Sequence, residues 1–298
     1  MHAKPYVGRF APTPSGHLHF GSLLAALASY LDARHHTGRW LVRIEDLDQP
    51  RNMPGATDHI LSTLENYGLG WEGNVLQQSQ NLDRYSHILH SLIKRGEAYY
   101  CDCSRKLIME HGGVYPGFCR TRDLPAGSNH AIRVQVPDQQ IRLSDRLQGI
   151  FSQNLASEVG DFVVRRRDGI VAYQFAVVVD DIDQGITDIV RGADLLDSTP
   201  RQLWLYHLLE ATPPRYLHIP LIMRRQGEKL SKRLASEPIE TGHAPATLFR
   251  ALTALGQQPP HALRNAPVSE QLAWAAPNWQ PQRLPAIQQM LEDSLPPT

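Results

Sequence analysis

Two stretches far apart in the sequence carry side chains that could hold a triphosphate. The first, Arg9–Ser22 (RFAPTPSGHLHFGS), links an apolar run to a helix-like segment and includes His17, His19 and Gly21. Backbone N–H groups at a helix start, together with the helix dipole, favour a phosphate, and a glycine lets a nucleotide approach closely. We expect His19 to donate to a phosphate oxygen with Gly21 and Ser22 beside the nucleotide, although loop histidines alone usually lie on the surface.

The second stretch, Gly227–Arg233 (GEKLSKR), follows a strand-like run and places Lys229 and Lys232 beside Ser231. A pentacoordinate α-phosphate gains charge on its equatorial oxygens, and cations placed there stabilise the transition state more than the ground state. Two loop lysines alone would usually form a solvated surface. Together, the two stretches predict a site for ATP with Mg²⁺, in which His19, Lys229 and Lys232 are catalytic.

Three cysteines, Cys101, Cys103 and Cys119, form a third group. Structural zinc takes four ligands, so the fourth would be Tyr115, His111 or a water, and histidine is in general the commoner choice. Alternatively, the three are unrelated buried thiols. An odd number of cysteines argues against a disulfide framework and favours a reducing compartment, so we expect a cytoplasmic protein.

Composition narrows the class of protein. The 298 residues are 42% hydrophobic and 20% charged, as in an ordinary globular protein. Thirty Lys and Arg balance thirty Asp and Glu, so an RNA partner would need local basic patches. The candidates are Arg165–Arg167, Arg201, Arg224 and Arg225, and the first of these could equally be a solvated hairpin. The apolar run Leu23–Leu31 is too short to span a bilayer, so we expect no membrane partner.

Apolar spacing predicts the elements that position these groups. Strands are expected at residues 5–10 and 40–44, and helices at 22–34, 57–67 and 83–95. This alternation predicts an α/β fold with a parallel sheet. Later, the β-branched run Ile170–Val179 predicts a strand buried on both faces, Ser198–Glu210 a helix and Tyr216–Met223 another strand.

The alternation breaks at Tyr99 and resumes near Ile170, which predicts an inserted domain. We therefore expect a Rossmann-type doubly wound parallel sheet with an inserted small zinc-containing domain and a short helical C-terminal region. The predicted boundaries are 1–98 and 168–233 for the two halves of the catalytic domain, 99–167 for the insertion and 234–298 for the helical region.

The pair HFGS and KLSKR resembles the HIGH and KMSKS signatures of class I aminoacyl-tRNA synthetases, over roughly residues 5–235. Within that family the glutamyl group is the most similar, through RFAPTPSGHLHFG, LVRIEDLD, YQFAVVVDDIDQGITDIVRGADLL, TPRQ and KLSKR. Phe20 and Ser22 depart from the first signature and Arg233 from the second. The resemblance implies that the protein activates glutamate as an acyl-adenylate.

By this resemblance, Arg9 and Arg191 grip one carboxylate of glutamate through paired hydrogen bonds. Glu45 then faces the ammonium group, and Ala11, Thr13 and Tyr173 complete the pocket. The alternative for each charged residue is a structural ion pair at a strand end. Two buried arginines without a carboxylate between them would be unpaired, so glutamine should be rejected.

The order Cys, Cys, Tyr, Cys also resembles the zinc site of the shortened glutamyl relatives, which favours Tyr115 as the fourth ligand. Only 65 residues follow Arg233 (298 − 233 = 65), so a separate anticodon-reading domain does not fit. The chain thus resembles the glutamyl-queuosine tRNA(Asp) synthetases, whose implied reaction loads glutamate onto the queuosine base of tRNA(Asp). The alternatives are a shortened enzyme charging the 3′ end of tRNA(Glu) and a non-catalytic RNA-binding paralogue. We expect a monomer.

Overall fold

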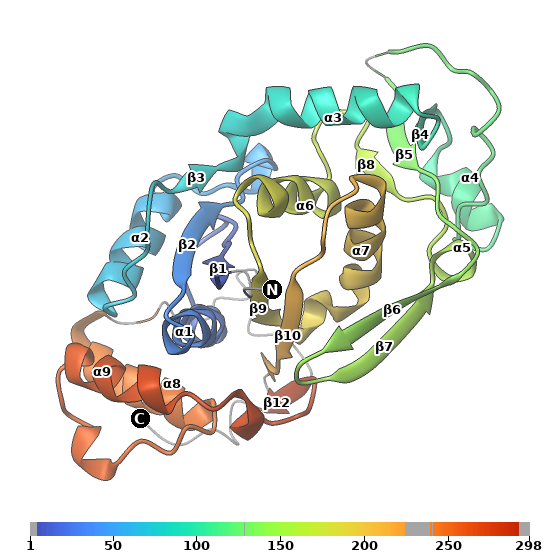
Figure 1. Ribbon diagram of the computed structural model, residues 1–298. Helices are drawn as coiled ribbons and strands as arrows, with labels where there is room; N and C mark the ends of the chain where they lie inside the picture. The colour runs from blue at the N-terminus through green and yellow to red at the C-terminus, as the bar shows by residue number, and fades with distance from the viewer. Residues whose placement is uncertain (1–4, 128, 224–238, 240, 292–298) are drawn as a thin grey trace.

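A computed structural model describes residues 5–127, 129–223, 239 and 241–291, and it contains two sheets built mainly of parallel strands (Figure 1). The first sheet has the order β1-β2-β3 and the second β7-β6-β10-β9, in which only the pairing of β6 with β7 is antiparallel. Their bounds are Val7–Phe10 (β1), Arg39–Ile44 (β2), Leu76–Gln77 (β3), Gln140–Asp145 (β6), Gly149–Asn154 (β7), Asp188–Gly192 (β9) and Arg215–Ile219 (β10).

The two sheets meet along β1 and β9. The backbone N–H of Thr187 donates to the carbonyl of Val7 at 2.9 Å, and the Val7 N–H donates to Thr187 Oγ1 at 2.8 Å. The carboxyl ends of β1, β2, β9 and β10 therefore lie at one edge of the assembly, which is the place where open α/β sheets bind ligands.

Helices cover these sheets. Helix α1, which follows β1, has no polar face toward solvent along most of its length, because it packs against β1, β9 and the C-terminal helices. The α-helices within the described residues are Phe20–His35 (α1), Ala56–Asn66 (α2), Leu82–Lys94 (α3), Arg105–Glu110 (α4), Leu155–Glu158 (α5), Tyr173–Asp183 (α6), Thr199–Leu208 (α7), Ala244–Ala254 (α8) and Val268–Asn278 (α9). Short 3-10 turns occupy Gln49–Arg51, Gln78–Asn81, Ala193–Ser198, Thr241–His243, His261–Leu263 and Pro281–Arg283. Among the described helices, none has the length and apolarity needed to cross a bilayer.

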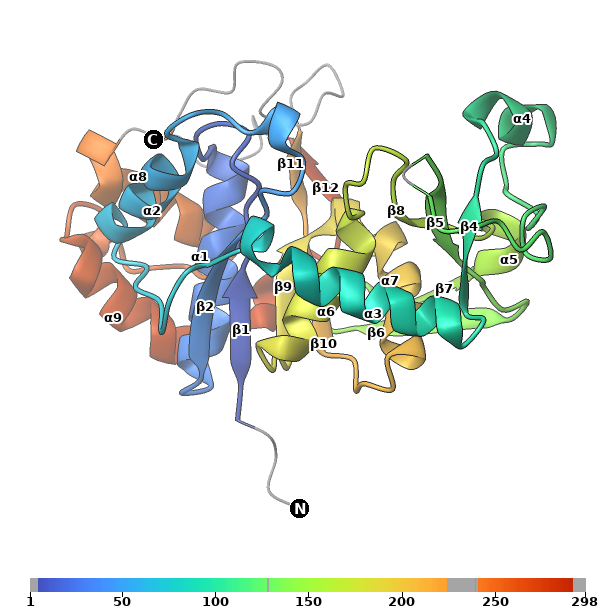
Figure 2. The same cartoon turned by 90° about the horizontal axis from the view of Figure 1, so that it is seen from above.

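A separate antiparallel sheet lies at one end of the molecule. It has the order β4-β5-β8, with bounds Ala98–Cys101, Ala131–Val134 and Val163–Arg165. Figures 1 and 2 both place this sheet and α4 at the opposite end from α8 and α9. The hairpin β6–β7 comes from the same part of the sequence but pairs with β10, so residues 99–167 contribute to both structures.

The expected elements before residue 99 are all present, within a few residues of their predicted bounds, and so is the helix predicted at Ser198–Glu210. The strand predicted at Ile170–Val179 is wrong, because Tyr173–Asp183 forms helix α6. Its residues from Phe175 to Asp181 are all buried, so this part of the helix faces protein on every side. A helix buried all round shows no helical periodicity, and its valines then imitate a buried strand.

The strand predicted at Tyr216–Met223 is two strands, since Pro220 separates β10 from β11 (Leu221–Met223). Strand β11 pairs in parallel with β12 (Gln289–Leu291), a strand within the region that we expected to be helical. The C-terminal region thus returns to the edge where the carboxyl ends of the main strands lie.

Candidate active site

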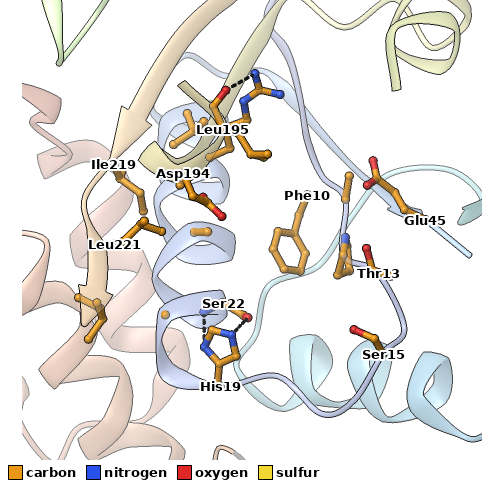
Figure 3. A pocket seen from close by; sticks show the side chains of 18 of the residues that line it. Phe10, Thr13, Ser15, His19, Ser22, Glu45, Asp194, Leu195, Ile219 and Leu221 are labelled. Atoms are coloured by element: carbon orange, nitrogen blue, oxygen red, sulfur yellow. Dashed lines mark hydrogen bonds between the residues drawn. The ribbon is translucent and has the colours of Figure 1, made fainter. Parts of the chain in front are cut away.

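A cavity of about 650 Å³ opens at the carboxyl ends of β1, β9 and β10 (Figure 3). In Figure 3, Phe10, Thr13 and Glu45 lie on one side of it and Asp194, Ile219 and Leu221 on the other. All nine predicted binding residues that the structure describes line the cavity: Arg9, Ala11, Thr13, His19, Gly21, Ser22, Glu45, Tyr173 and Arg191. The cavity therefore unites residues that the sequence spreads over more than 180 positions.

The second phosphate motif cannot be placed in the same way. Lys229, Ser231 and Lys232 lie outside the described residues, as do Arg224 and Arg225 of the predicted basic patches. Other lining residues were not predicted, including Arg51, Asp194 and the run from Ile219 to Ile222. The run could have been found, because the residues that end a parallel strand face the ligand edge of the sheet.

His19 caps the start of helix α1. Its Nδ1 accepts a hydrogen bond from the Ser22 backbone N–H at 3.2 Å, so the ring proton resides on Nε2, which lies 3.0 Å from Ser22 Oγ. A side chain at Gly21 would place its Cβ 3.2 Å from the His19 ring. The glycine thus has a second role beyond ligand approach, because it lets the histidine ring fold over the first turn of the helix.

Arg9 lies in a buried cluster of charges. Its Nε and Nη2 donate to the two carboxylate oxygens of Asp181 at 3.2 and 3.3 Å, and Arg43 Nη2 lies 2.8 Å from Asp181 Oδ1. Burial favours protonation of Asp181, but Arg43 and Arg9 outweigh it and hold the pKa of this carboxyl below its usual value. The positive charge of Arg9 is therefore already balanced in part by the protein.

Glu45 belongs to the same cluster, since its Oε1 lies 3.7 Å from Arg43 Nη2. Burial raises the pKa of Glu45 to about 7, against the opposing effect of Arg43 and Arg9. Its Oε1 has no hydrogen-bond partner within the described residues. A buried carboxylate oxygen without a donor suits a ligand that brings N–H groups, such as an ammonium.

Arg191 is held differently. Its Nε donates to His218 Nε2 at 3.0 Å, and its Nη2 donates to Thr199 Oγ1 at 2.9 Å. Across the ranges that the structure describes, Arg191 makes no salt bridge, and its buried Nη1 has no hydrogen-bond partner. An arginine that is 5% exposed with an unmatched charge suits an anionic ligand, because a buried cation without a counter-ion is costly.

Tyr173 reaches the cavity although its predicted element was wrong. It is the first residue of helix α6, whose start lies at the cavity wall, and the same helix carries Asp181 two turns later. Burial raises the pKa of Tyr173, so the phenol stays protonated and can donate a hydrogen bond.

Basic residues lie at the cavity mouth. Asp48 pairs with Arg51, which lines the cavity, at 2.6 Å, and with Arg166 at 3.5 Å. Asp48 thus links Arg166 of the predicted run Arg165–Arg167 to the cavity-lining Arg51, and Arg165 and Arg167 line a second hollow of about 540 Å³. Arg201 is half-buried, which lowers its pKa, and its Nη2 contacts Ser198 Oγ at 3.3 Å.

The three cysteines converge at the end of the antiparallel sheet. The sulfur atoms of Cys101, Cys103 and Cys119 all lie within 4.8 Å of one another. Guanidinium groups approach two of them, with Arg133 Nε 3.3 Å from Cys101 Sγ and Arg122 Nη1 3.5 Å from Cys119 Sγ. Three thiols together with neighbouring cations fit a site that holds thiolates around a metal ion.

Tyr115 is closer to this cluster than the alternative His111. The Tyr115 hydroxyl lies 3.4 Å from Cys101 Sγ and 3.6 Å from Cys103 Sγ, whereas His111 is exposed and directs Nδ1 to the Leu107 carbonyl at 2.8 Å. Within the described residues, the group of metal-ligating side chains includes no histidine.

Comparison with known proteins assigns the class. The model of the family "tRNA synthetases class I (E and Q), catalytic domain" matches residues 6–113 and 120–287, and the chain belongs to this family. Of the residues that we expected to bind the nucleotide and the amino acid, those that the structure describes line one cavity.

Within the family, similar curated proteins carry one name. A protein called "Glutamyl-Q tRNA(Asp) synthetase" from Ectopseudomonas mendocina is 55% identical over 97% of this chain and 98% of its own length. One of the same name from Pseudomonas aeruginosa is 56% identical over 97% of this chain and 99% of its own.

Solved structures show the same fold. The glutamate-tRNA synthetase of Elizabethkingia anophelis superposes with a TM-score of 0.81 at 24% identity, over 97% of this chain and 69% of that one. A glutamate tRNA ligase from Elizabethkingia meningosepticum, described as being in complex with its amino acid, gives 0.79 at 26% identity over 94% and 66%. The chain therefore has an α/β fold with a parallel sheet, and it matches about two thirds of these longer proteins.

Proposed function

We propose that the protein activates glutamate with ATP and transfers it to the queuosine base in the anticodon of tRNA(Asp). The observation that carries this proposal is the end-to-end match to proteins named glutamyl-Q tRNA(Asp) synthetase, at 55% identity over 97% of this chain and 98% of the relative. The cavity supports it independently, because Arg9, Glu45 and Arg191 supply charges complementary to glutamate.

In the proposed activation, the substrate ammonium lies against Glu45, and a carboxylate of the substrate lies between Arg9 and Arg191, with Ala11, Thr13 and Tyr173 around it. An oxygen of the α-carboxylate attacks the α-phosphorus of ATP. The new P–O bond forms as the bond to the bridging oxygen breaks, and pyrophosphate leaves with Mg²⁺. His19, Gly21 and Ser22 are assigned to the phosphates, and Lys229, Ser231 and Lys232 of the second motif are assigned to the charge that builds up in the transition state.

In the proposed transfer, a hydroxyl of queuosine attacks the carbonyl carbon of the adenylate, and AMP leaves. The acceptor needs a positively charged route to the cavity. The Arg51–Asp48–Arg166 contact supports this requirement, since it links Arg166 to an arginine that lines the cavity. Reversing the charges of Arg166 and Arg167 should reduce transfer to tRNA while ATP–pyrophosphate exchange continues.

The finer description of the fold belongs to the same proposal. We infer a Rossmann-type doubly wound catalytic domain (1–98 and 168–233), an insertion (99–167) and a C-terminal region (234–298), in a monomer that works in the cytoplasm. We further infer that Cys101, Cys103, Tyr115 and Cys119 hold a structural Zn²⁺. Metal analysis of the purified protein should give one zinc per chain, and C103S should lose it.

The acceptor is tested by incubating the protein with ATP, labelled glutamate and tRNA from cells with and without queuosine. We expect label only with queuosine-containing tRNA, and we expect it to stay with the anticodon fragment after nuclease cleavage. Label on the 3′-terminal adenosine would overturn the proposal in favour of a shortened tRNA(Glu)-charging enzyme. Absence of both adenylate and label would indicate a non-catalytic paralogue.

A further inference from the structure

Three neighbouring strands carry a chain of buried polar side chains behind the cavity. Asp145 ends β6, His218 lies on β10, and Arg191 lies on β9 directly opposite His218 in the strand register. Asp145 Oδ2 is 2.7 Å from His218 Nδ1, and His218 Nε2 is 3.0 Å from Arg191 Nε. All three side chains are at most 6% exposed, and of the three only Arg191 lines the cavity.

The hydrogen bonds fix the tautomer of His218. An arginine Nε–H can only donate, so His218 Nε2 must be an acceptor, and the ring proton must be on Nδ1. Asp145 provides the matching acceptor for that proton. Burial lowers the pKa of His218, and the nearby Arg191 charge acts in the same direction against the attraction of Asp145, so the ring is neutral.

Asp145 is itself held in one orientation. Its Oδ1 accepts hydrogen bonds from the backbone N–H groups of Leu147 at 2.9 Å and Gln148 at 2.8 Å. Only Oδ2 therefore faces the imidazole nitrogen. Burial acts against ionisation of Asp145, but the bond from His218 and the backbone donors prevail and lower its pKa, so it remains a carboxylate.

Arg191 thus makes its inward contacts with neutral groups. The Nε–H of Arg191 donates to His218, and Nη2 donates to Thr199 Oγ1. The Thr199 hydroxyl in turn donates its own proton to the Leu195 carbonyl at 2.9 Å. Within the described residues, the buried Nη1 has no hydrogen-bond partner, so its donors remain uncommitted. A carboxylate in the place of the imidazole would hold the guanidinium equally firmly but would neutralise its charge.

We propose that Asp145 and His218 are positioning residues for the amino-acid pocket: they fix the guanidinium of Arg191 through a neutral acceptor, so that its orientation is set and its charge stays available for a substrate carboxylate. This inference rests on the proposed function, in which Arg191 binds glutamate. It adds two residues that do not line the cavity to the set that determines affinity for the amino acid.

The most direct test is D145N, which keeps the number and arrangement of the non-hydrogen atoms. The backbone donors of Leu147 and Gln148 require the amide oxygen at the Oδ1 position, so the NH₂ group must face His218. The ring then moves its proton to Nε2, which points at Arg191. We expect KM for glutamate in ATP–pyrophosphate exchange to rise about 10- to 100-fold, with KM for ATP and kcat changed less than about threefold.

A matched pair at His218 separates positioning from packing. H218F keeps the ring size and removes the acceptor, so it should raise KM for glutamate as D145N does. H218Q keeps an amide oxygen that can accept from Arg191 and an NH₂ that can donate to Asp145, so it should recover affinity to within about fivefold of wild type. Equal KM values for H218F and H218Q would overturn the proposal.

A spectroscopic readout does not depend on activity. In ¹⁵N-histidine NMR of the wild-type protein, assigned by comparison with H218Q, His218 should carry its proton on Nδ1, and in D145N on Nε2. The same tautomer in both proteins would contradict the proposal.

Two further variants identify which idea fails. Y6F removes a comparable buried bond, from Tyr6 to Asp32 at 2.6 Å, away from the cavity, and should leave KM for glutamate unchanged. If R191Q raises KM for glutamate while D145N and H218F do not, the positioning role of Asp145 and His218 is wrong, but the proposed glutamate pocket is still supported. If R191Q leaves KM unchanged, the proposed glutamate pocket is wrong, and the positioning role falls with it.

Discussion

Arg9 and Arg191 reach one cavity from β1 and β9, and the protein holds them with opposite kinds of partner. Arg9 forms a two-bond pair with the Asp181 carboxylate, which also binds Arg43. Arg191 is held by a neutral imidazole and a hydroxyl. Both sets of partners fix the orientation of the guanidinium group. The partners of Arg9 also balance its charge, whereas those of Arg191 leave its charge unbalanced. A substrate carboxylate should therefore gain more at Arg191 than at Arg9.

The largest effect is expected from removing the unbalanced charge. R191Q should lower kcat/KM for glutamate by about 1,000-fold and abolish most of the preference for glutamate over glutamine, because the cavity then has no unpaired cation that rejects a neutral amide. ATP–pyrophosphate exchange with each amino acid measures both. R191K is the matched control: it keeps the charge but not the fork, so it should lose rate and keep the preference. A strong preference surviving in R191Q would contradict the comparison.

The free energy of unfolding should depend more on the charge cluster around Arg9 than on Arg191, which is the opposite of the order expected for activity. D181N leaves Arg9 and Arg43 without their shared counter-ion and should lower the free energy of unfolding by about 3–5 kcal/mol. Asp183 on the same helix offers the control, since its pair with Arg84 is exposed and D183N should cost no more than about 1 kcal/mol. Urea unfolding of both variants measures the difference, and equal losses would show that the Arg9 cluster is not a stabilising ion pair.

Glu45, in the charge cluster around Arg9, should also make the binding of glutamate depend on pH. Since burial raises the pKa of Glu45 to about 7, this group is ionised above pH 7 and protonated below it. KM for glutamate should rise about tenfold per pH unit below 7, as the anion facing the ammonium is lost, and level off above it. In E45Q the profile should be flat at a high KM. A flat profile in the wild type would remove Glu45 from the ammonium site.

The same shift affects folding. Because the folded pKa of Glu45 lies above its ordinary value of 4.5, the folded state holds an extra proton between these two values. The stability contributed by this group is therefore present at low pH and is lost as the pH rises through about 7.

The smallest effect concerns the stability of R191Q. Removing a buried cation that has no counter-ion should leave the free energy of unfolding within about 1 kcal/mol of wild type, or raise it, despite the loss of activity. Urea unfolding of R191Q alongside D181N measures this contrast. Destabilisation of R191Q by as much as D181N would mean that Arg191 serves the fold rather than the ligand.

The residues that line the cavity could be predicted from the sequence more readily than the hydrogen-bond and ion-pair partners that fix their orientation. Arg9, Glu45 and Arg191 each lie within one residue of the end of a strand, so their place at the ligand edge follows from the topology of a parallel sheet. The partner of Arg9 was also within reach: the Asp180–Asp181 pair interrupts an apolar run, and a buried acid requires a cation. It was missed because that run was assigned to a strand.

Asp145 and His218 were beyond reach for a different reason. Asp145 lies in residues assigned to an insertion, and nothing in the local pattern shows that β6 leaves that region and pairs with β10. Strand pairing between segments 73 residues apart is a long-range property, which residue spacing along the chain does not encode.

The Arg9–Asp181 pair has a consequence during synthesis. The two residues are 172 positions apart, so Arg9 and Arg43 leave the ribosome well before their common counter-ion exists. At about 5–20 residues per second, the interval is on the order of ten to thirty seconds. We expect the first α/β half to stay open during this time, and the buried arginines to enter the interior only when helix α6 arrives with its acid. The cavity then forms late, in one cooperative step that joins the earliest and the later-made parts of the nascent chain.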